Sequence, residues 1–360
     1  MKKMKFALFG FPKTGKTTLF NLLTGAEYEV GFHPKKKDEL HLRTCLIPDD
    51  RLDKLAALFP EKEKKPATID FIDLVGFQPG EIKTSSYLVQ LRLVDGLAHV
   101  VRGFKAEEIP HIHPEINPRH DISRMEEELI LADLLSIEKR LSKLEKELRG
   151  KTSSLGLREK EILEKAQQHL LKGQPLREID FLREEEKFLR AFSFLSQKPI
   201  VQAINLDESE LTKIESPQEF LPRPGPRQAV MAFCGQIESE ITQLPPQEQE
   251  QFLREYGLKE FSIAKFLRIS FQVLNLIVFY TVGKKEVKAW TIPENTPAPQ
   301  AAGVIHTDME KGFIRAEVIP VKDLLQCGSW AQAREKGLIQ LHGKDYSIQD
   351  GDVVYFRFAT

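Results

Sequence analysis

The sequence predicts an α/β fold: a phosphate-loop nucleotide-binding domain with an inserted antiparallel helical arm, followed by a small α+β unit. Three observations predict it. A glycine-containing loop joins an apolar strand to a helix near the N-terminus. A Leu-, Glu- and Lys-rich stretch interrupts the strand pattern from about 121 to 198, and short strand-like runs follow residue 275. Apolar runs that alternate with helical patterns are typical of α/β proteins.

The composition is that of a folded protein with two or three domains, since 41% of the 360 residues are hydrophobic and 29% are charged. A formal net charge of −1 gives no global attraction to nucleic acid or membrane. The cysteines Cys45, Cys234 and Cys327 are too few and too far apart for a disulfide framework or a zinc site. No apolar segment reaches the roughly 18 residues of a membrane span. We therefore expect a cytoplasmic protein.

The N-terminal loop has the spelling of a phosphate-binding loop. The run "KFALFG" predicts a buried strand, and "KTTLFNLLTG" predicts a helix, so that "GFPKTGKT" from Gly10 to Thr17 joins the two. Backbone N–H groups at the helix start would bind an anion, Lys16 would reach the β- and γ-phosphates, and the Thr17 hydroxyl would bind Mg²⁺. A glycine turn that carries Lys-Thr by chance is the alternative. The predicted nucleotide-binding residues here are Lys13, Thr14, Gly15, Lys16, Thr17 and Thr18.

A metal-binding acid is expected in "TIDFIDLVG", where a strand ends in Asp73-Leu74-Val75-Gly76. Asp73 would hold Mg²⁺ and the Gly76 N–H would contact the γ-phosphate, so Lys16, Thr17, Asp73 and Gly76 form the predicted catalytic group. In Ras-type enzymes the next residue is a glutamine that orients the attacking water. Here it is Phe77, which cannot hydrogen-bond water, and Gln78 follows one position later.

The base-recognition segment is expected after the strand in "KPIVQAINLDESEL". Guanine-specific enzymes carry Asn-Lys-x-Asp, whose aspartate accepts hydrogen bonds from guanine. The sequence Asn205-Leu206-Asp207-Glu208 therefore argues against strict guanine selection and permits ATP. A polar loop after a strand is the alternative. Cys234, in "AVMAFCGQI", is expected at the end of the last strand of this domain.

The middle of the chain has helical periodicity. Leu134, Ile137, Leu141, Leu144 and Leu148 recur three and four residues apart, which predicts a coiled-coil seam. A second helix is expected over about 157–171 and a third over about 176–195. Charges of both signs are mixed along this stretch, which indicates a solvated surface. Beyond it, "LNLIVFYTV", "KEVKAWTI" and "DGDVVYFRF" predict strands of a small sheet, the last of them alternating like an edge strand.

With these motifs in place, the sequence resembles the YchF/Obg-like ATPases. The strongest match is the tail "KEVKAWTIPENTPAPQAAGVIHTDMEKGFIRAEVI" with "GKDYSIQDGDVVYFRF", which is similar to the family's TGS domain, a ubiquitin-like sheet. "PDDRLDKLA", "HVVRGF" and "EEELILADL" match further family stretches in order. The resemblance implies a nucleotide-binding domain at 1–120 and 199–275, a coiled-coil arm at 121–198 and a TGS domain at 276–360. It also implies ATP preference through Asn205, Leu206 and Glu208, backbone contact of the base near Cys234, and ribosome association.

The chain departs from the family pattern in two places. Lys13 occupies the slot of an asparagine that the family associates with a potassium ion, and its ammonium could replace that ion, which puts potassium dependence in doubt. The first switch of the family contains a threonine that closes on Mg²⁺. The matching stretch here is His33-Pro34-Lys35-Lys36-Lys37, without a threonine.

The function expected from the sequence is a monomeric, slow, Mg²⁺-dependent ATPase switch that associates with the ribosome or ribosomal RNA. One alternative is a nucleotide-responsive binding module with negligible hydrolysis, which the missing threonine favours. Another is a GTP-preferring GTPase.

Overall fold

The computed structural model describes residues 4–26, 28, 41–74, 76–78, 80, 86–106, 115–150 and 153–359. Contacts within the chain divide it into two compact units. One holds Lys5–Arg43 and Asp70–Val273, and the other holds Met4, Thr44–Ile69 and the residues from Leu274 onward. Across the described part of the chain, every helix is too short or too polar to traverse a lipid bilayer.

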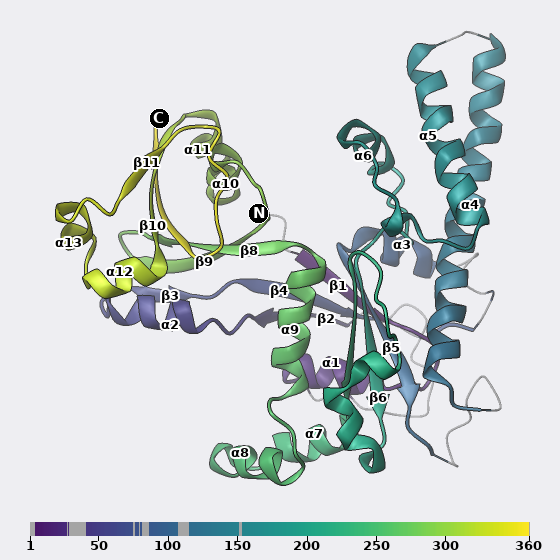
Figure 1. Ribbon diagram of the computed structural model, residues 1–360, viewed down its shortest axis with the longest axis horizontal. Coiled ribbons are helices and arrows are strands. Elements are labelled where there is room, and N and C mark those ends of the chain that lie inside the picture. Colours follow the sequence, from purple (N-terminus) through teal and green to yellow (C-terminus); the bar gives the residue numbers. More distant parts are fainter. Residues whose placement is uncertain are drawn as a thin grey trace. The chain divides into compact units, whose positions relative to one another are not determined.

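A sheet with parallel pairs forms the centre of the first unit. Among the described residues it has six strands in the order β2-β4-β1-β5-β6-β7 (Figure 1). The pairs β1–β5, β5–β6 and β6–β7 are parallel, and strands buried on both faces read as continuous apolar runs. The strands are β1 (Met4–Phe9), β2 (His41–Leu46), β4 (Thr68–Asp73), β5 (Gly96–Gly103), β6 (Ile200–Leu206) and β7 (Gln228–Phe233).

Helices cover this sheet and complete two apolar clusters. One cluster joins strand residues such as Phe9 and Leu97 to Leu91 of α3 and Leu129 of α4. The other joins β6 and β7 to α7 and α8 through residues such as Ile237. The helices are α1 (Lys16–Thr24), α3 (Ser86–Leu93), α7 (Gly235–Thr242), α8 (Pro246–Glu255) and α9 (Ser262–Val273), with 3₁₀ segments at Glu208–Glu215 and Pro217–Glu219.

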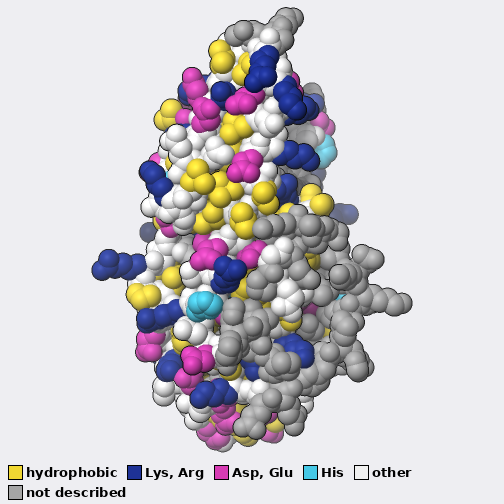
Figure 2. Space-filling model, turned by 90° about the vertical axis from the view of Figure 1, so that its right-hand side faces the viewer, with side chains coloured by type: hydrophobic (Ala, Val, Ile, Leu, Met, Phe, Trp, Pro, Cys, Tyr) yellow, Lys and Arg dark blue, Asp and Glu magenta, His cyan; other side chains and the backbone are white. Residues whose placement is uncertain are grey.

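The arm between β5 and β6 is a helical hairpin of α4 (Pro118–Gly150) and α5 (Ser154–Leu171), which lie side by side in Figure 1. The predicted seam is present, because Ile137 and Leu141 of α4 share one apolar cluster with Ile162 and Leu163 of α5, and Leu144 is buried as well. Charges of both signs are interspersed over the upper part of the view in Figure 2, as the sequence predicted. The third predicted helix is wrong over most of its length.

In place of that third helix the chain forms a 3₁₀ turn (Leu176–Glu178) and a short α6 (Arg183–Leu189). The apolar periodicity there serves another purpose, because Leu176, Leu189 and Phe194 each pack into the cluster between the arm helices. Apolar side chains from several separate turns fill this one cluster, and their spacing in the sequence resembles the period of a continuous helix.

The second unit is built on a sheet of six strands within the described residues, in the order β11-β10-β12-β8-β9-β3. Its strands from the C-terminal part of the chain are β8 (Leu276–Val282), β9 (Glu286–Pro293), β10 (Phe313–Pro320), β11 (Gln340–His342) and β12 (Asp352–Phe358). The helices are α10 (Ala298–Ile305), α11 (Thr307–Lys311), α12 (Val321–Cys327) and α13 (Trp330–Glu335). The expectation that "DGDVVYFRF" forms an edge is wrong, because β12 lies between β10 and β8. Apolar and polar residues alternate along β12 because one face of the sheet packs on the core and part of the other face is exposed to solvent.

The remaining strand of this second sheet, β3 (Glu63–Lys65), comes from the segment Thr44–Ile69, which also carries α2 (Asp50–Ala57). β3 pairs with β9 in parallel, with Lys64 opposite Val287. Asp49 caps α2 and accepts a hydrogen bond from the Tyr280 hydroxyl at 2.5 Å. The α/β class with a helical arm and a C-terminal α+β unit is confirmed, whereas the domain boundaries proposed from sequence stay a proposal.

Candidate nucleotide-binding site

The loop between β1 and α1 has the backbone that a phosphate-binding loop requires. Gly10 and Gly15 have φ values of 146° and 95°, a region that side chains rarely adopt. A Cβ on Gly15 would lie 2.2 Å from Nδ2 of Asn205, and one on Gly10 would lie 2.6 Å from the carbonyl oxygen of Val100. Both glycines are therefore fixed by conformation and by space. α1 begins at Lys16, so its first N–H groups are directed toward the loop.

Lys16 and Gly76 lie next to each other in the structure. Lys16 is 7% exposed, and its ammonium donates to the carbonyl oxygen of Phe11 at 2.6 Å. A Cβ on Gly76 would lie 2.7 Å from the Cα of Pro12 and 2.9 Å from the Lys16 Nζ, and the Pro12 backbone leaves no room for a side chain there. The backbone of residue 76 is thus placed beside the positive charge that would hold a phosphate group.

Thr17 and Asp73 form the other predicted pair. The Thr17 hydroxyl donates to Oδ2 of Asp73 at 3.0 Å, and Asp73 is buried at the end of β4. These oxygens are the donors that Mg²⁺ prefers, and they stand 3.0 Å apart, close enough for both to reach one ion. Within the described residues, no group of three or more His, Cys, Asp or Glu could hold a metal alone. The pair therefore suits Mg²⁺, which usually keeps waters and shares its coordination with phosphate.

Asn205 connects two loops. Its Nδ2 donates to the carbonyl oxygen of Thr14 at 3.2 Å, and its Oδ1 accepts from the Gly235 N–H at 3.0 Å. The amide thereby fixes the phosphate loop against the turn that follows β7. Leu206 is buried at the end of β6, and Glu208 is exposed where a 3₁₀ segment begins. Base recognition by the segment 205–208 remains a prediction.

The other predicted residues surround this loop with different exposures. Thr14 is buried and its hydroxyl donates to Phe11 O at 3.3 Å. Thr18 is half-buried, and a Cβ on Gly235 would lie 2.9 Å from its methyl group. Lys13 is exposed, with a positive φ of 62°. Cys234 is fully buried before α7, and burial raises the pKa of its thiol, which keeps it neutral and unreactive.

Phe77 faces the interior. It is 4% exposed and packs against Phe11, with ring centroids 6.0 Å apart, and against Tyr87, at 5.0 Å. Gln78, one residue later, is exposed. The position that a water-orienting glutamine occupies in Ras-type enzymes thus carries a side chain of the apolar core. The stretch His33 to Lys37, which lacks the expected threonine, lies outside the described residues.

Comparison with known proteins agrees with this geometry. Residues 5–140 match the family model for a 50S ribosome-binding GTPase, and residues 276–359 match the C-terminal YchF-GTPase model, a protein of unknown function (DUF933). The ribosome-binding ATPase YchF of Bacillus subtilis is 36% identical over 98% of this chain and 98% of its own length. The chain belongs to the YchF/Obg-like ATPase family. The Obg-like ATPase 1 of Oryza sativa subsp. japonica, 32% identical over 99% of this chain and 92% of its own, extends the match to a plant.

The fold of this family is also found among solved structures. The YchF GTPase of Schizosaccharomyces pombe superposes with a TM-score of 0.82 at 26% identity, covering 99% of this chain and 98% of that one. The family resemblance predicted from sequence is therefore confirmed. The names of these relatives differ on the nucleotide, because the Bacillus subtilis and Oryza sativa proteins are called ATPases and the Schizosaccharomyces pombe protein a GTPase.

Sequence reasoning missed two polar residues beneath the phosphate loop of this family member. His99 and Gln202 stand opposite each other in the β5–β6 ladder, and His99 Nδ1 donates to Gln202 Oε1 at 2.7 Å. A Cβ on Gly10 would lie 3.3 Å from the His99 ring, so the imidazole supports the loop from below. Burial lowers the pKa of His99 to about 3, which keeps the ring neutral. Both residues could have been identified as polar side chains in the middle of the largely apolar strand sequences "LAHVVRG" and "IVQAINL".

Proposed function

We propose that this chain is an ATP-binding, Mg²⁺-dependent switch protein that hydrolyses ATP slowly. One observation carries the proposal: Lys16, Gly76 and the Thr17–Asp73 pair meet around one glycine loop. Phosphoryl transfer needs little covalent chemistry from the protein. It needs positioning and charge, which an ammonium group, a metal held by oxygen ligands and backbone N–H groups supply. When bound, Mg²⁺ would neutralise the charge that develops on the phosphates.

Slow turnover is supported by Phe77. With this side chain in the apolar core, residue 77 offers no hydrogen bond to an attacking water. Loss of one such positioning contact typically costs about 10²- to 10³-fold in rate. Hydrolysis then depends on Lys16, the metal pair and whatever group a partner adds.

Adenine preference is supported by the segment Asn205 to Glu208. Leu206 stands where guanine-specific enzymes have lysine, and Glu208 stands where they have the aspartate that accepts from guanine. Glu208 is exposed, so no buried carboxylate is directed at a guanine edge from this position. The ATPase names of the curated relatives point in the same direction.

Ribosome association is supported by similarity. The curated bacterial relatives are named ribosome-binding ATPases, and the model that matches residues 5–140 describes a 50S ribosome-binding GTPase. We extend this partner to the present chain, acting as a monomer in the cytoplasm. The formal net charge of −1 means that contact with ribosomal RNA has to come from a local surface.

Calorimetric titration with ATP, GTP and their diphosphates in magnesium buffer, with and without potassium, tests the proposal. We expect ATP to bind more tightly than GTP, and Lys16→Ala to abolish the heat of binding. Lys13→Ala is the matched variant, because it removes the same charge from an exposed position of the same loop. A gain of potassium dependence in Lys13→Ala would support replacement of the ion by the Lys13 ammonium. Tighter GTP binding would make the chain a GTPase.

A second candidate is a nucleotide-responsive module without hydrolysis, which the burial of Phe77 favours. Single-turnover hydrolysis measured with and without ribosomes separates the two. We expect phosphate release above the level of Lys16→Ala, and a faster rate with ribosomes. Release equal to that of Lys16→Ala in both conditions would establish the module.

A further inference from the structure

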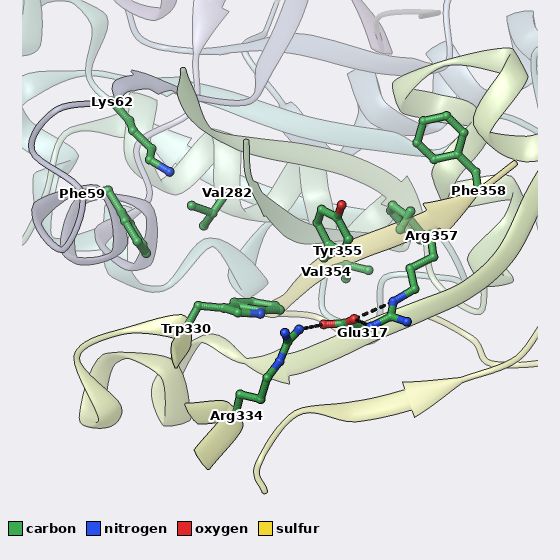
Figure 3. Close-up of a pocket in the computed structure, with 11 residues that line it drawn as sticks. Phe59, Lys62, Val282, Glu317, Trp330, Arg334, Val354, Tyr355, Arg357 and Phe358 are labelled. Atoms are coloured by element: carbon green, nitrogen blue, oxygen red, sulfur yellow. Dashed lines mark hydrogen bonds and ion pairs between the residues drawn. The ribbon is translucent and has the colours of Figure 1, made fainter. Parts of the chain in front are cut away.

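The C-terminal sheet has an open half-face with a groove of about 660 Å³ (Figure 3). In the β10–β12 ladder Ala316 stands opposite Phe356, and both belong to the apolar cluster on the covered face. The next pair, Glu317 and Tyr355, points to the other face. There α13 forms one wall, and the turn after α2 forms another through Phe59 and Lys62, as the labelled side chains in Figure 3 show.

Aromatic rings line this groove. Tyr355 is 57% exposed although it lies in the middle of a strand with neighbours on both sides. Trp330, the first residue of α13, and Phe59 add two more rings. Exposed rings on a sheet face are the platform on which unpaired nucleobases stack, because every base has a flat π-surface.

Two arginines are fixed in the same groove by one buried carboxylate. Glu317 is 2% exposed and accepts from Nη2 of Arg334 and from Nε of Arg357, each at 2.6 Å. Figure 3 shows the carboxylate between the two guanidinium groups. The arginine side chains remain 60% and 52% exposed, so further N–H donors face solvent in a fixed geometry. Guanidinium groups held in this way suit phosphate oxygens.

The charge of the groove is unbalanced in favour of an anion. Lys62, Arg334 and Arg357 contribute three cations, and Glu317 is the single carboxylate among the groove's lining residues. Arg315 also stands directly opposite Arg357 in the ladder. Like charges opposite each other destabilise a sheet, and a bound anion offsets that cost.

From these contacts we propose that the groove binds a single-stranded segment of RNA, with bases stacked on Tyr355 and Trp330 and a backbone phosphate held by Arg334 and Arg357. An extended peptide would fit less well, because β10 and β12 each have a partner strand on both sides and leave no edge for strand pairing. An unpaired base can bind by stacking on the aromatic rings, and a phosphate can bind by accepting from the guanidinium groups. Neither contact requires a free strand edge. The inference rests on the proposed ribosome association and names the chemistry of that contact.

The test uses the full chain with Trp290→Phe. The sequence has two tryptophans, and Trp290 is buried, so this variant leaves Trp330 as the fluorescent reporter inside the groove. Titration with a 12-nucleotide oligoadenylate is expected to quench Trp330. In the same background, Tyr355→Ala is expected to weaken binding about 5- to 150-fold, the range measured for one base stack. Arg334→Ala is expected to weaken binding and to lower the slope of log K against log salt by about 0.7.

Lys344→Ala is the matched control, because it removes an exposed cation from the same unit outside the groove. It is expected to leave the affinity unchanged. Equal losses in Lys344→Ala and Arg334→Ala, unchanged Trp330 fluorescence, or equally tight binding of a duplex of the same length would overturn the proposal. Displacement of the oligonucleotide by deca-glutamate at equal concentration would assign the groove to an acidic protein segment and would overturn it too.

The proposed function fails separately. Pelleting with ribosomes and ATP titration are run on the same variants. In one outcome, Tyr355→Ala weakens oligoadenylate binding but the unaltered chain does not pellet with ribosomes. That outcome supports RNA binding in the groove and contradicts ribosome association. In the opposite outcome, the chain does not bind oligoadenylate, and Tyr355→Ala leaves ATP binding and pelleting with ribosomes unchanged. That outcome overturns RNA binding in the groove and leaves the proposed function intact.

Discussion

The phosphate loop and the aromatic groove are both suited to anions, but they use different parts of the chain. The loop uses the backbone of consecutive residues between Gly10 and Thr17, and glycine is required where a side chain would collide. The groove uses side chains that come from positions as far apart as Phe59 and Arg357. A site made of consecutive backbone groups has to be specified by the local sequence. A site made of distant side chains is specified only by the fold.

The largest effect is expected where backbone conformation and space both require glycine. In Gly15→Ala the new Cβ would lie 2.2 Å from the Asn205 amide, at a φ of 95°. Strain and overpacking together are expected to lower the free energy of unfolding by about 4 kcal/mol. Denaturant unfolding measures the loss, and ATP binding is expected to be lost with it.

Gly25→Ala is the control for that variant. Gly25 also has a positive φ, 62°, but a Cβ there has no atom within 4 Å. Its loss is expected to be about 1 kcal/mol, from strain alone. Equal losses in the two variants would show that the Asn205 contact does not specify the loop.

Phe77→Gln tests why hydrolysis is expected to be slow. Either residue 77 is of the wrong type to orient water, or its side chain is buried away from the nucleotide. Since residue 77 is buried between Phe11 and Tyr87, a glutamine there would bury an amide among aromatic rings. We expect a loss of about 3 kcal/mol in the free energy of unfolding and no gain in ATP hydrolysis. Gln78→Ala, at the exposed neighbour, is expected to change stability by no more than about 0.5 kcal/mol. A faster single-turnover rate in Phe77→Gln would mean that the segment turns residue 77 toward the nucleotide.

The sequence predicted what local patterns determine. The strand before Gly10, the helix from Lys16 and the meeting of Thr17 with Asp73 follow from motif spacing and the parallel sheet. It did not predict that Thr44–Ile69 would join the C-terminal sheet, because β3 is a polar three-residue strand whose partner β9 lies more than 200 positions later. The third arm helix failed for a related reason. Leu176 and Phe194 share one apolar cluster without sharing one helix.

A buried pair below the phosphate loop is expected to make stability depend on pH. His99 has a pKa of about 3 in the folded chain and about 6.5 when unfolded. Above pH 6.5 neither state is protonated and the full stability is present. As the pH falls below 6.5 the unfolded chain takes up the proton first, so the free energy of unfolding falls by about 2 kcal/mol between pH 7 and pH 5.

The measurement compares slopes rather than absolute stabilities. In His99→Asn the dependence of unfolding on pH between 7 and 5 is expected to flatten by this amount. His306→Asn removes an exposed histidine and is expected to keep the original slope. If the slope of His99→Asn equals that of the unaltered chain, the acid sensitivity belongs to another group.

The smallest effect is expected where the segment between the nucleotide motifs is attached to the second sheet. The Tyr280 hydroxyl donates to Asp49 Oδ2 at 2.5 Å, and burial raises the pKa of Tyr280, so the group remains a donor at neutral pH. Tyr280→Phe removes this bond to a charged acceptor and is expected to cost about 1.5 kcal/mol in thermal unfolding. Tyr355→Phe makes the same change at an exposed ring of the same unit and is expected to cost nothing measurable. A cost for Tyr280→Phe that does not exceed this control would mean that β3 pairing and α2 packing hold the segment without the hydroxyl. The attachment of Thr44–Ile69 to the second sheet would then depend mainly on the burial of apolar side chains, as does the packing of the two arm helices against each other.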